Sequence, residues 1–192
     1  LTHDLEHTDL KSTPSEVAEL ASMSMELLSR EHWDILFSNP AELKKARIEQ
    51  LEQVLSTLVW VATIDKFQHW IYENHTHSLA QRTEAWNTIL NQFGSKIIDW
   101  SGLESVKNNM WLKQLHIFEV PFYYIEYGMA QLGAIAIWRN YKKSPEKAVK
   151  QYTAALKLGY TKSIGEIYAE AGIKFDFSES YVRELADFVS LE

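Results

Sequence analysis

The 192 residues are enough for one domain with a substantial hydrophobic core, and the content of 46% hydrophobic and 23% charged residues is ordinary for a globular protein. The net charge of -7 argues against a nucleic acid or an anionic membrane surface as the main partner. Because the sequence has no cysteine, disulfides and thiolate metal sites are excluded.

The first predicted element is a helix over residues 12–29, STPSEVAELASMSMELLS. Its apolar residues cover roughly half of the helical circumference, which is wide for a surface helix. Thr13, Pro14 and Glu16 have the spacing of a capping box with a proline at the first helical position. We therefore expect Thr13 to cap this helix and Glu16 to complete the cap.

Glu19 and Glu26 lie on the remaining narrow strip of the same helix, together with Arg30. Two interpretations are open at this point. The strip can be a solvated face on which Arg30 is the charge partner of the two glutamates, which is the commoner arrangement. Alternatively, one of the glutamates faces a metal ion or an active site.

The rest of the chain also has the pattern of helices. Glycine and proline are scarce, and capping boxes at Ser78–Gln81 and Ser163–Glu166 predict two helix starts. The predicted helices cover residues 41–75, 78–94, 121–143, 144–159, 163 onward and 180–191, with a less regular stretch at 96–114. No strand alternation is visible. The sequence thus predicts an all-α protein, organised as one multi-helix unit over residues 1–192.

Two stretches invite other interpretations. Residues 123–138, YYIEYGMAQLGAIAIW, are apolar but contain Glu126 and many small residues, which indicates a buried helix and not a membrane span. Residues 144–160 resemble half of a tetratricopeptide repeat. Because a solenoid needs several copies at a period of about 34 residues and no second copy is present, a plain amphipathic helix is expected.

Residues 116–128, HIFEVPFYYIEYG, are a candidate site. His116 precedes a proline that we expect to open a helix carrying Tyr123, Tyr124 and Tyr127. Tyr124 and Tyr127 are three residues apart and so share a helical face. An imidazole and phenol hydroxyls that converge can donate hydrogen bonds to a developing oxyanion. Aromatic core packing is the alternative, and composition alone favours it.

Another candidate is the series Asp65, His69 and Glu73, at spacing i, i+4 and i+8 on the long helix, followed by His75 and His77. Such spacing can hold a metal ion, although a hydrogen-bonded ladder on a helix surface is more common. A di-iron carboxylate bundle needs Glu-x-x-His on two helices. The sequence contains no Glu-x-x-His, so this interpretation is not favoured.

Two of these motifs carry a family resemblance. STPSEVAELASMSMELL and HIFEVPFYYIEYGMAQLGA together resemble the C-terminal part of an oligoendopeptidase F-type zinc metallopeptidase, in the superfamily of thimet oligopeptidase. DKFQHWIYENHTHS is also similar, so the resemblance covers essentially the whole chain. It implies an all-helical, zincin-like fold around a deep channel, in which short peptides are the substrates.

The resemblance also implies roles for single residues. The family holds zinc with two histidines of H-E-x-x-H and with the first glutamate of an E-x-x-S-x-x-x-E pattern. Glu19-Leu20-Ala21-Ser22-Met23-Ser24-Met25-Glu26 matches that pattern, which makes Glu19 the third zinc ligand and Glu26 a supporting acid close to the metal.

The second motif carries over in the same way. A histidine and tyrosines of the family bind substrate and stabilise the tetrahedral intermediate, and His116, Tyr124 and Tyr127 match them best. Tyr123 is the alternative position and is expected to bind substrate.

This sequence lacks H-E-x-x-H, and the resemblance implies that the chain begins just after that motif. We therefore expect a fragment of a cytoplasmic zinc endopeptidase, inactive alone and without tightly bound zinc. Its missing partner is then the N-terminal part of the same protein. A non-catalytic helical peptide-binding module, similar to tetratricopeptide proteins, is the alternative. The sequence upstream of Leu1 distinguishes the two.

Overall fold

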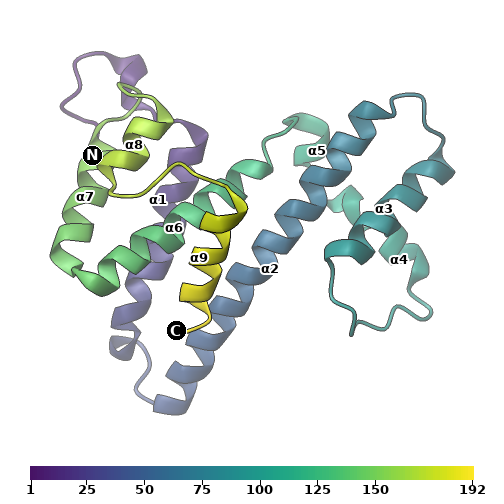
Figure 1. The fold of residues 1–192 in the computed structure, drawn as a ribbon, viewed down its shortest axis with the longest axis horizontal. Coiled ribbons are helices and arrows are strands. Elements are labelled where there is room, and N and C mark those ends of the chain that lie inside the picture. Colours follow the sequence, from purple (N-terminus) through teal and green to yellow (C-terminus); the bar gives the residue numbers. More distant parts are fainter. The chain divides into compact units, whose positions relative to one another are not determined.

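The computed structural model describes all residues 1–192 and contains helices but no strand (Figure 1), which confirms the all-α prediction. The α-helices are α1 Ser15–Ser29, α2 Pro40–Glu73, α3 Leu79–Phe93, α4 Glu104–Asn109, α5 His116–Glu119, α6 Ile125–Lys143, α7 Pro145–Lys157, α8 Ile164–Glu170 and α9 Glu179–Val189. Short 3-10 helices are η1 Thr8–Lys11, η2 Arg30–Ile35 and η3 Met110–Lys113.

The contacts divide the chain into two compact units. Unit 1 consists of Leu1–Gln53 with Met129–Glu192, and unit 2 consists of Val54–Gly128. The division falls inside α2 and inside α6, so each of these helices contributes residues to both units. The organisation of residues 1–192 as one domain stays a prediction.

Unit 1 has a core built from α1, α6, α8 and α9. Its fully buried side chains include Val17, Leu20, Leu27, Ile137, Trp138, Ile167, Tyr168 and Leu185. A Cβ atom added to Gly133 of α6 would lie 2.6 Å from Leu20 Cδ1 and 3.1 Å from the Tyr168 ring. Glycine at this position therefore allows α6 to pack closely against α1 and α8. Tyr152 of α7 adds a hydrogen bond to the Ala21 carbonyl oxygen at 2.9 Å.

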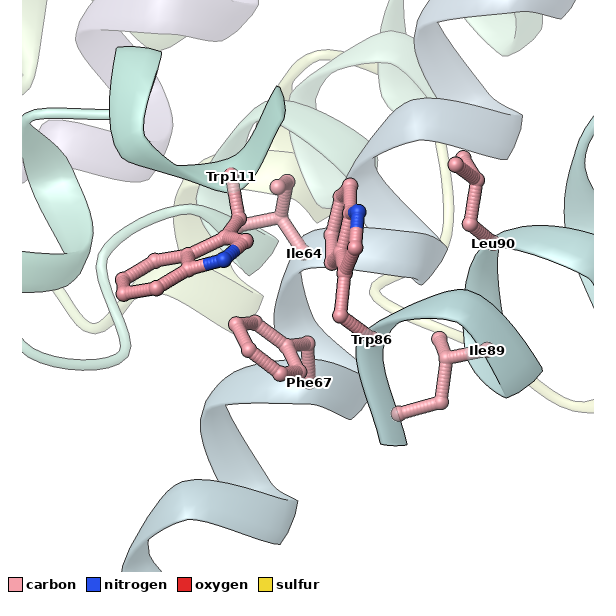
Figure 2. Packing of buried hydrophobic residues seen from close by; sticks show 6 residues of the cluster. All are labelled: Ile64, Phe67, Trp86, Ile89, Leu90 and Trp111. Carbon is pink, nitrogen blue, oxygen red and sulfur yellow. The ribbon is translucent and has the colours of Figure 1, made fainter. Parts of the chain in front are cut away.

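Unit 2 is held together by aromatic packing between α2, α3 and η3 (Figure 2). Its buried cluster consists of Ile64, Phe67, Trp86, Ile89, Leu90 and Trp111. The Phe67 ring lies 5.1 Å from the Trp86 ring and 5.5 Å from the Trp111 ring, between centroids. Trp86 Nε1 also donates a hydrogen bond to the Lys107 carbonyl oxygen at 2.8 Å. Because large aromatic side chains bury much apolar surface, this cluster fixes the irregular stretch after α3 against α2.

Two of the three predicted capping boxes are confirmed. Ser78 and Ser163 cap α3 and α8, and both bonds of each box are present with Gln81 and Glu166. The helix over residues 144–159 is also confirmed, because α7 begins at Pro145 after Ser144 and buries one face. Its single apolar face fits a plain amphipathic helix.

The predicted cap of the first helix is wrong. Helix α1 begins at Ser15 and its N-cap residue is Pro14, with no side-chain capping bond. The Pro14 carbonyl oxygen accepts hydrogen bonds from the amides of Val17 and Ala18, each at 3.0 Å. Since the helix starts one residue later than predicted, the Thr13 side chain does not reach the first amides and Glu16 moves to the second helical position.

Arg30 is likewise not the charge partner of a solvated strip. It is buried, its Nη1 donates a hydrogen bond to the Arg47 carbonyl oxygen at 2.6 Å, and its guanidinium lies 5.2 Å from the Trp138 ring centroid. Arg47 Nη2 donates back to the Arg30 carbonyl oxygen at 3.2 Å. Burial lowers the pKa of Arg30 from its ordinary value, and the negative charge of Glu31 opposes that shift. Arg30 thus joins the end of α1 to α2 and α6 inside unit 1.

None of the helices is both long and apolar enough to cross a bilayer. The apolar stretch 123–138, read from the sequence as a buried helix, lies mainly in α6, where Ala134, Ile135, Ala136, Ile137 and Trp138 are all buried.

Candidate functional site

The glutamates of the first motif project from α1 in unit 1. Glu19 is half-buried, whereas Glu26 is exposed. Ser22 Oγ donates a hydrogen bond to the Glu19 carbonyl oxygen at 3.0 Å, and Gln50 Nε2 donates one to the Glu26 carbonyl oxygen at 3.1 Å. These bonds stabilise the backbone of α1 at both glutamates. The metal-binding role of Glu19 and the supporting role of Glu26 stay predictions.

Glu16 has a different neighbour in the same unit. Burial raises the pKa of the Tyr168 hydroxyl well above its ordinary value, and the negative charge of Glu16 raises it further. The start of α1 has no side-chain capping bond, so Glu16 does not have the capping role that the sequence suggested.

In unit 2 the residues of the second motif converge. The His116 Nε2 atom lies 3.1 Å from the Tyr127 hydroxyl oxygen, within hydrogen-bond distance. The His116 ring centroid lies 5.1 Å from the Tyr124 ring, 5.6 Å from the Tyr127 ring and 5.9 Å from the Tyr123 ring. The Tyr124 and Tyr127 rings are 5.2 Å apart. One imidazole and three phenols are therefore gathered at one place.

A hydrogen-bond network orients Tyr124. The Tyr124 hydroxyl donates to Gln114 Oε1 at 3.2 Å, and Trp60 Nε1 donates to the same oxygen at 2.9 Å. Burial raises the pKa of Tyr124, a hydrogen bond from Trp60 opposes the shift, and the neighbouring Tyr127 adds to it. A phenol is protonated at neutral pH even at its ordinary pKa, and the raised pKa extends the protonated state to higher pH, so Tyr124 is a hydrogen-bond donor at neutral pH.

The local structure of this motif differs from the prediction. Helix α6 begins at Ile125 and not at Pro121, so Tyr127 is helical while Tyr123 and Tyr124 precede the helix. The Tyr123 amide instead donates to the Val120 carbonyl oxygen at 3.2 Å, which closes a turn. Tyr124 and Tyr127 still meet, but through this turn and not through a shared helical face.

The two interpretations of the tyrosines are not exclusive in this structure. Tyr124 packs on the buried aromatic cluster of unit 2, as the core-packing interpretation requires. Its hydroxyl nevertheless joins a polar network beside His116, and His116 Nδ1 is buried without a hydrogen-bond partner.

In the series on the long helix, the structure shows one pairing, between Asp65 and His69, and no metal site. His69 Nε2 lies 3.6 Å from Asp65 Oδ2. Burial raises the pKa of Asp65, and the charge of His69 opposes that shift. His77 Nε2 accepts a hydrogen bond from Arg82 at 2.7 Å, which occupies one of its ring nitrogens. In the chain, no group of three or more histidine, cysteine, aspartate or glutamate side chains is arranged to hold a metal ion.

Gln114 and Trp60 were not predicted from the sequence. Gln114 lies two residues before His116, but nothing in the local pattern distinguishes it from other polar residues. Trp60 is 54 residues away from it along the chain. Their pairing depends on how α2 packs against the segment after η3, so no local signal could have identified them.

The model of Peptidase family M3 matches residues 2–187 of this chain. The chain belongs to that family. No curated protein matches the chain. Among solved structures, PZ peptidase A with a bound inhibitor is 26% identical, with a TM-score of 0.83, over 94% of this chain and 33% of that chain.

Two further structures belong to proteins named as oligoendopeptidase F. One is 27% identical with a TM-score of 0.81, over 94% of this chain and 32% of that chain. The other, from Bacillus anthracis str. Ames, is 25% identical with a TM-score of 0.77, over 99% of this chain and 30% of that chain. This M3 chain thus spans about a third of the length of the proteins it resembles, as the family resemblance of its motifs implied.

Proposed function

We propose that this M3 chain is the C-terminal part of the catalytic domain of a zinc-dependent endopeptidase of the oligoendopeptidase F type, which hydrolyses short peptides. Family membership and the two oligoendopeptidase F structures support this proposal. The observation that carries it is the convergence of His116, Tyr124 and Tyr127 in unit 2. The absence of cysteine is compatible with a cytoplasmic location.

In the proposed reaction, hydrogen bonds from this cluster stabilise the negative charge that develops on the carbonyl oxygen of the scissile peptide bond. The Tyr124 hydroxyl is protonated at neutral pH, as an ordinary phenol is, and it can turn from Gln114 toward an oxyanion. Tyr127 and His116 already share a hydrogen bond, which orients both groups. Tyr123, whose ring stacks on His116, would contact the substrate.

The residues of this chain do not form a zinc site by themselves. Zinc takes about four ligands, and Glu19 is the only position that matches a family ligand. We therefore propose that Glu19 supplies one ligand, that Glu26 supports it, and that the other ligands belong to a part of the protein outside these 192 residues. The isolated chain would then be inactive and would not bind zinc tightly.

Metal analysis tests this assignment. We expect the purified 192-residue chain to hold much less than one zinc per molecule after dialysis. In the complete protein, Glu19→Gln should lose zinc and activity together, whereas Glu16→Gln should keep both because Glu16 matches no ligand position of the family pattern. One tightly bound zinc in the isolated chain, or normal zinc content in the complete Glu19→Gln protein, would contradict the assignment.

Steady-state kinetics of the complete protein on a quenched fluorescent peptide tests the oxyanion role. Tyr124→Phe and Tyr127→Phe should lower kcat more than they raise KM, because the hydroxyls act in the transition state. Loss of one such donor typically costs about 10²–10³-fold in rate. Tyr160→Phe removes an exposed hydroxyl of unit 1 and should leave kcat unchanged. Near wild-type kcat in both site variants would assign these tyrosines to core packing alone.

The alternative, a non-catalytic peptide-binding module, has weaker support, since α7 is a single amphipathic helix of a chain in a peptidase family. The sequence upstream of Leu1 distinguishes the two functions: H-E-x-x-H there supports the endopeptidase, and its absence from the gene supports the binding module.

A further inference from the structure

The segment that joins α5 to α6 contains an unusual turn. The Tyr123 amide donates to the Val120 carbonyl oxygen at 3.2 Å, Pro121 occupies the second position, and Phe122 at the third position has φ +61°. Proline at the second position and a positive φ at the third are the features of a type II turn, in which the third residue is normally glycine or asparagine. Phe122 is the only residue other than glycine with a positive φ in this chain.

A bulky side chain in this backbone region is strained and persists only where surrounding structure holds it. Two aromatic residues of α2 do so here. The Phe122 ring lies 4.9 Å from the His69 ring and 4.9 Å from the Tyr72 ring, between centroids. His69 and Tyr72 are three residues apart, so they lie on one face of α2 and both contact the Phe122 ring. His69 Nε2 also lies 3.6 Å from Asp65 Oδ2.

The turn determines where the next two residues point. Directly after Phe122, the Tyr123 ring stacks on His116 and the Tyr124 hydroxyl reaches Gln114. The Tyr123 carbonyl oxygen then accepts the Glu126 amide at 2.9 Å, at the start of α6. An ordinary φ at Phe122 would turn the chain differently and move both tyrosines away from His116.

We propose that Phe122 is a positioning residue of the proposed peptidase site. Its ring, held by His69 and Tyr72, keeps the turn in the conformation that presents Tyr123 and Tyr124 to His116. It acts through Tyr124 and needs no contact with the substrate. This inference depends on the proposed function, because it assigns a role to the support of the same site.

Two substitutions separate the ring from the backbone conformation. Glycine in Phe122→Gly adopts a positive φ without strain but has no ring. Alanine in Phe122→Ala has no ring either, and its Cβ atom makes a positive φ strained. If the ring is the anchor, both variants lower kcat, by about 10-fold and up to the roughly 10²-fold that a misplacement of about 1 Å can cost. Phe122→Tyr keeps the ring contacts and should keep kcat. If only the backbone conformation mattered, Phe122→Gly would equal the wild type.

The matched control is Phe118→Ala, which removes an exposed ring that stacks on Trp111 from the same segment. It should leave kcat unchanged. Tyr72→Leu removes one of the two ring contacts of Phe122 without altering the sequence of the turn. Because Tyr72 is half exposed, this variant should fold even if the variants at Phe122 do not. We expect it to lower kcat by a smaller factor than Phe122→Gly.

The deciding measurement is a double-mutant cycle for kcat in the complete protein, with a quenched fluorescent peptide as substrate. If Phe122 acts through Tyr124, the effect of Phe122→Gly should fall below about 3-fold in a Tyr124→Phe background. Undiminished loss in that background, or wild-type kcat in Phe122→Gly and Tyr72→Leu, would overturn the inference. Wild-type kcat in Tyr124→Phe and Tyr127→Phe would instead refute the oxyanion role of these tyrosines, and the role of Phe122 with it. Failure of the complete wild-type protein to hydrolyse the peptide would refute the proposed function itself.

Discussion

Replacement of Gln114 by leucine should measure how much the hydrogen bonds of Gln114 with Trp60 and Tyr124 contribute to the stability of unit 2. Gln114 Oε1 accepts hydrogen bonds from Trp60 Nε1 at 2.9 Å and from the Tyr124 hydroxyl at 3.2 Å. Leucine has a similar volume but no acceptor, so Gln114→Leu leaves both donors without a partner. Each neutral hydrogen bond contributes about 0.5–1.5 kcal/mol net. Because both donors are only partly buried and water can replace one acceptor, we expect a loss of about 1–2 kcal/mol.

Urea denaturation of the 192-residue chain, followed by tryptophan fluorescence and by far-UV circular dichroism, measures this change in the free energy of unfolding. Coincident transitions in the two signals are needed before a single free energy is assigned. The midpoint should fall while the m-value stays constant, since the surface exposed on unfolding does not change.

Two control variants identify the cause of that change. Gln114→Glu retains an acceptor oxygen and should stay within about 0.5 kcal/mol of the wild type. Gln92→Leu removes an exposed acceptor, bonded to Lys66 at 2.7 Å, and should also cost less than about 0.5 kcal/mol. A Gln114→Leu variant as stable as Gln92→Leu would refute the view that Gln114 holds Trp60 and Tyr124 in place.

Three further predictions concern unit 1. Ser163→Ala should lower the free energy of unfolding by about 0.5–2 kcal/mol because it removes the cap of α8, whereas Thr13→Ala should change it by less than about 0.5 kcal/mol; urea melts of both variants compare them. Gly133→Ala should cost about 1–3 kcal/mol through overpacking, while Gly165→Ala, with no atom within 4 Å of the added Cβ, should be neutral or stabilising in the same assay. Burial raises the pKa of Tyr168 in the folded state, so its contribution to stability is complete below the unfolded value of about 10 and is lost as the pH rises above it. The stability of Tyr168→Phe should therefore fall less between pH 9 and about 11 than that of the wild type, and equal slopes would contradict the assignment.

The sequence predicted helix starts well where only one start was compatible with the pattern. Ser78 and Ser163 each precede a helix and have the matching residue three positions later, and both boxes form. Thr13 failed because Pro14 can serve either as the first helical residue or, in an extended conformation, as the N-cap. Pro14 has ψ 146° and takes the second role. The local pattern permits both starts, one residue apart, and does not distinguish them.

The same ambiguity explains the error at Pro121. Proline is favoured both at the first position of a helix and at the second position of a type II turn. Contacts of Phe122 with His69 and Tyr72 accompany the turn, and these residues are distant in sequence, so propensity alone could not decide. His116, Tyr124 and Tyr127 nevertheless lie together, because the turn brings the three rings to one place without the assumed helix, and their functional role stays a prediction.

Gln114 and Phe122 illustrate why the residues that position a candidate site are harder to predict than the residues of the site. A candidate donor can be recognised by its chemistry and by its motif, as Tyr124 was. Its support is set by tertiary packing: Gln114 is placed by Trp60, and Phe122 by His69 and Tyr72. All three of these partners lie on α2, the helix that also carries Ile64 and Phe67 of the buried cluster.

This arrangement gives the aromatic core of unit 2 a direct part in the proposed chemistry. A donor stabilises a transition state only if it is held within about 0.5 Å of its working position. Tyr124 precedes α6 and lies outside any helix, so contacts with other parts of unit 2 must hold its hydroxyl in position. Packing on the buried cluster fixes its ring, and the hydrogen bond to Gln114 fixes its hydroxyl. Core packing and the proposed oxyanion role, which were alternatives in the sequence, are therefore compatible in the same side chain.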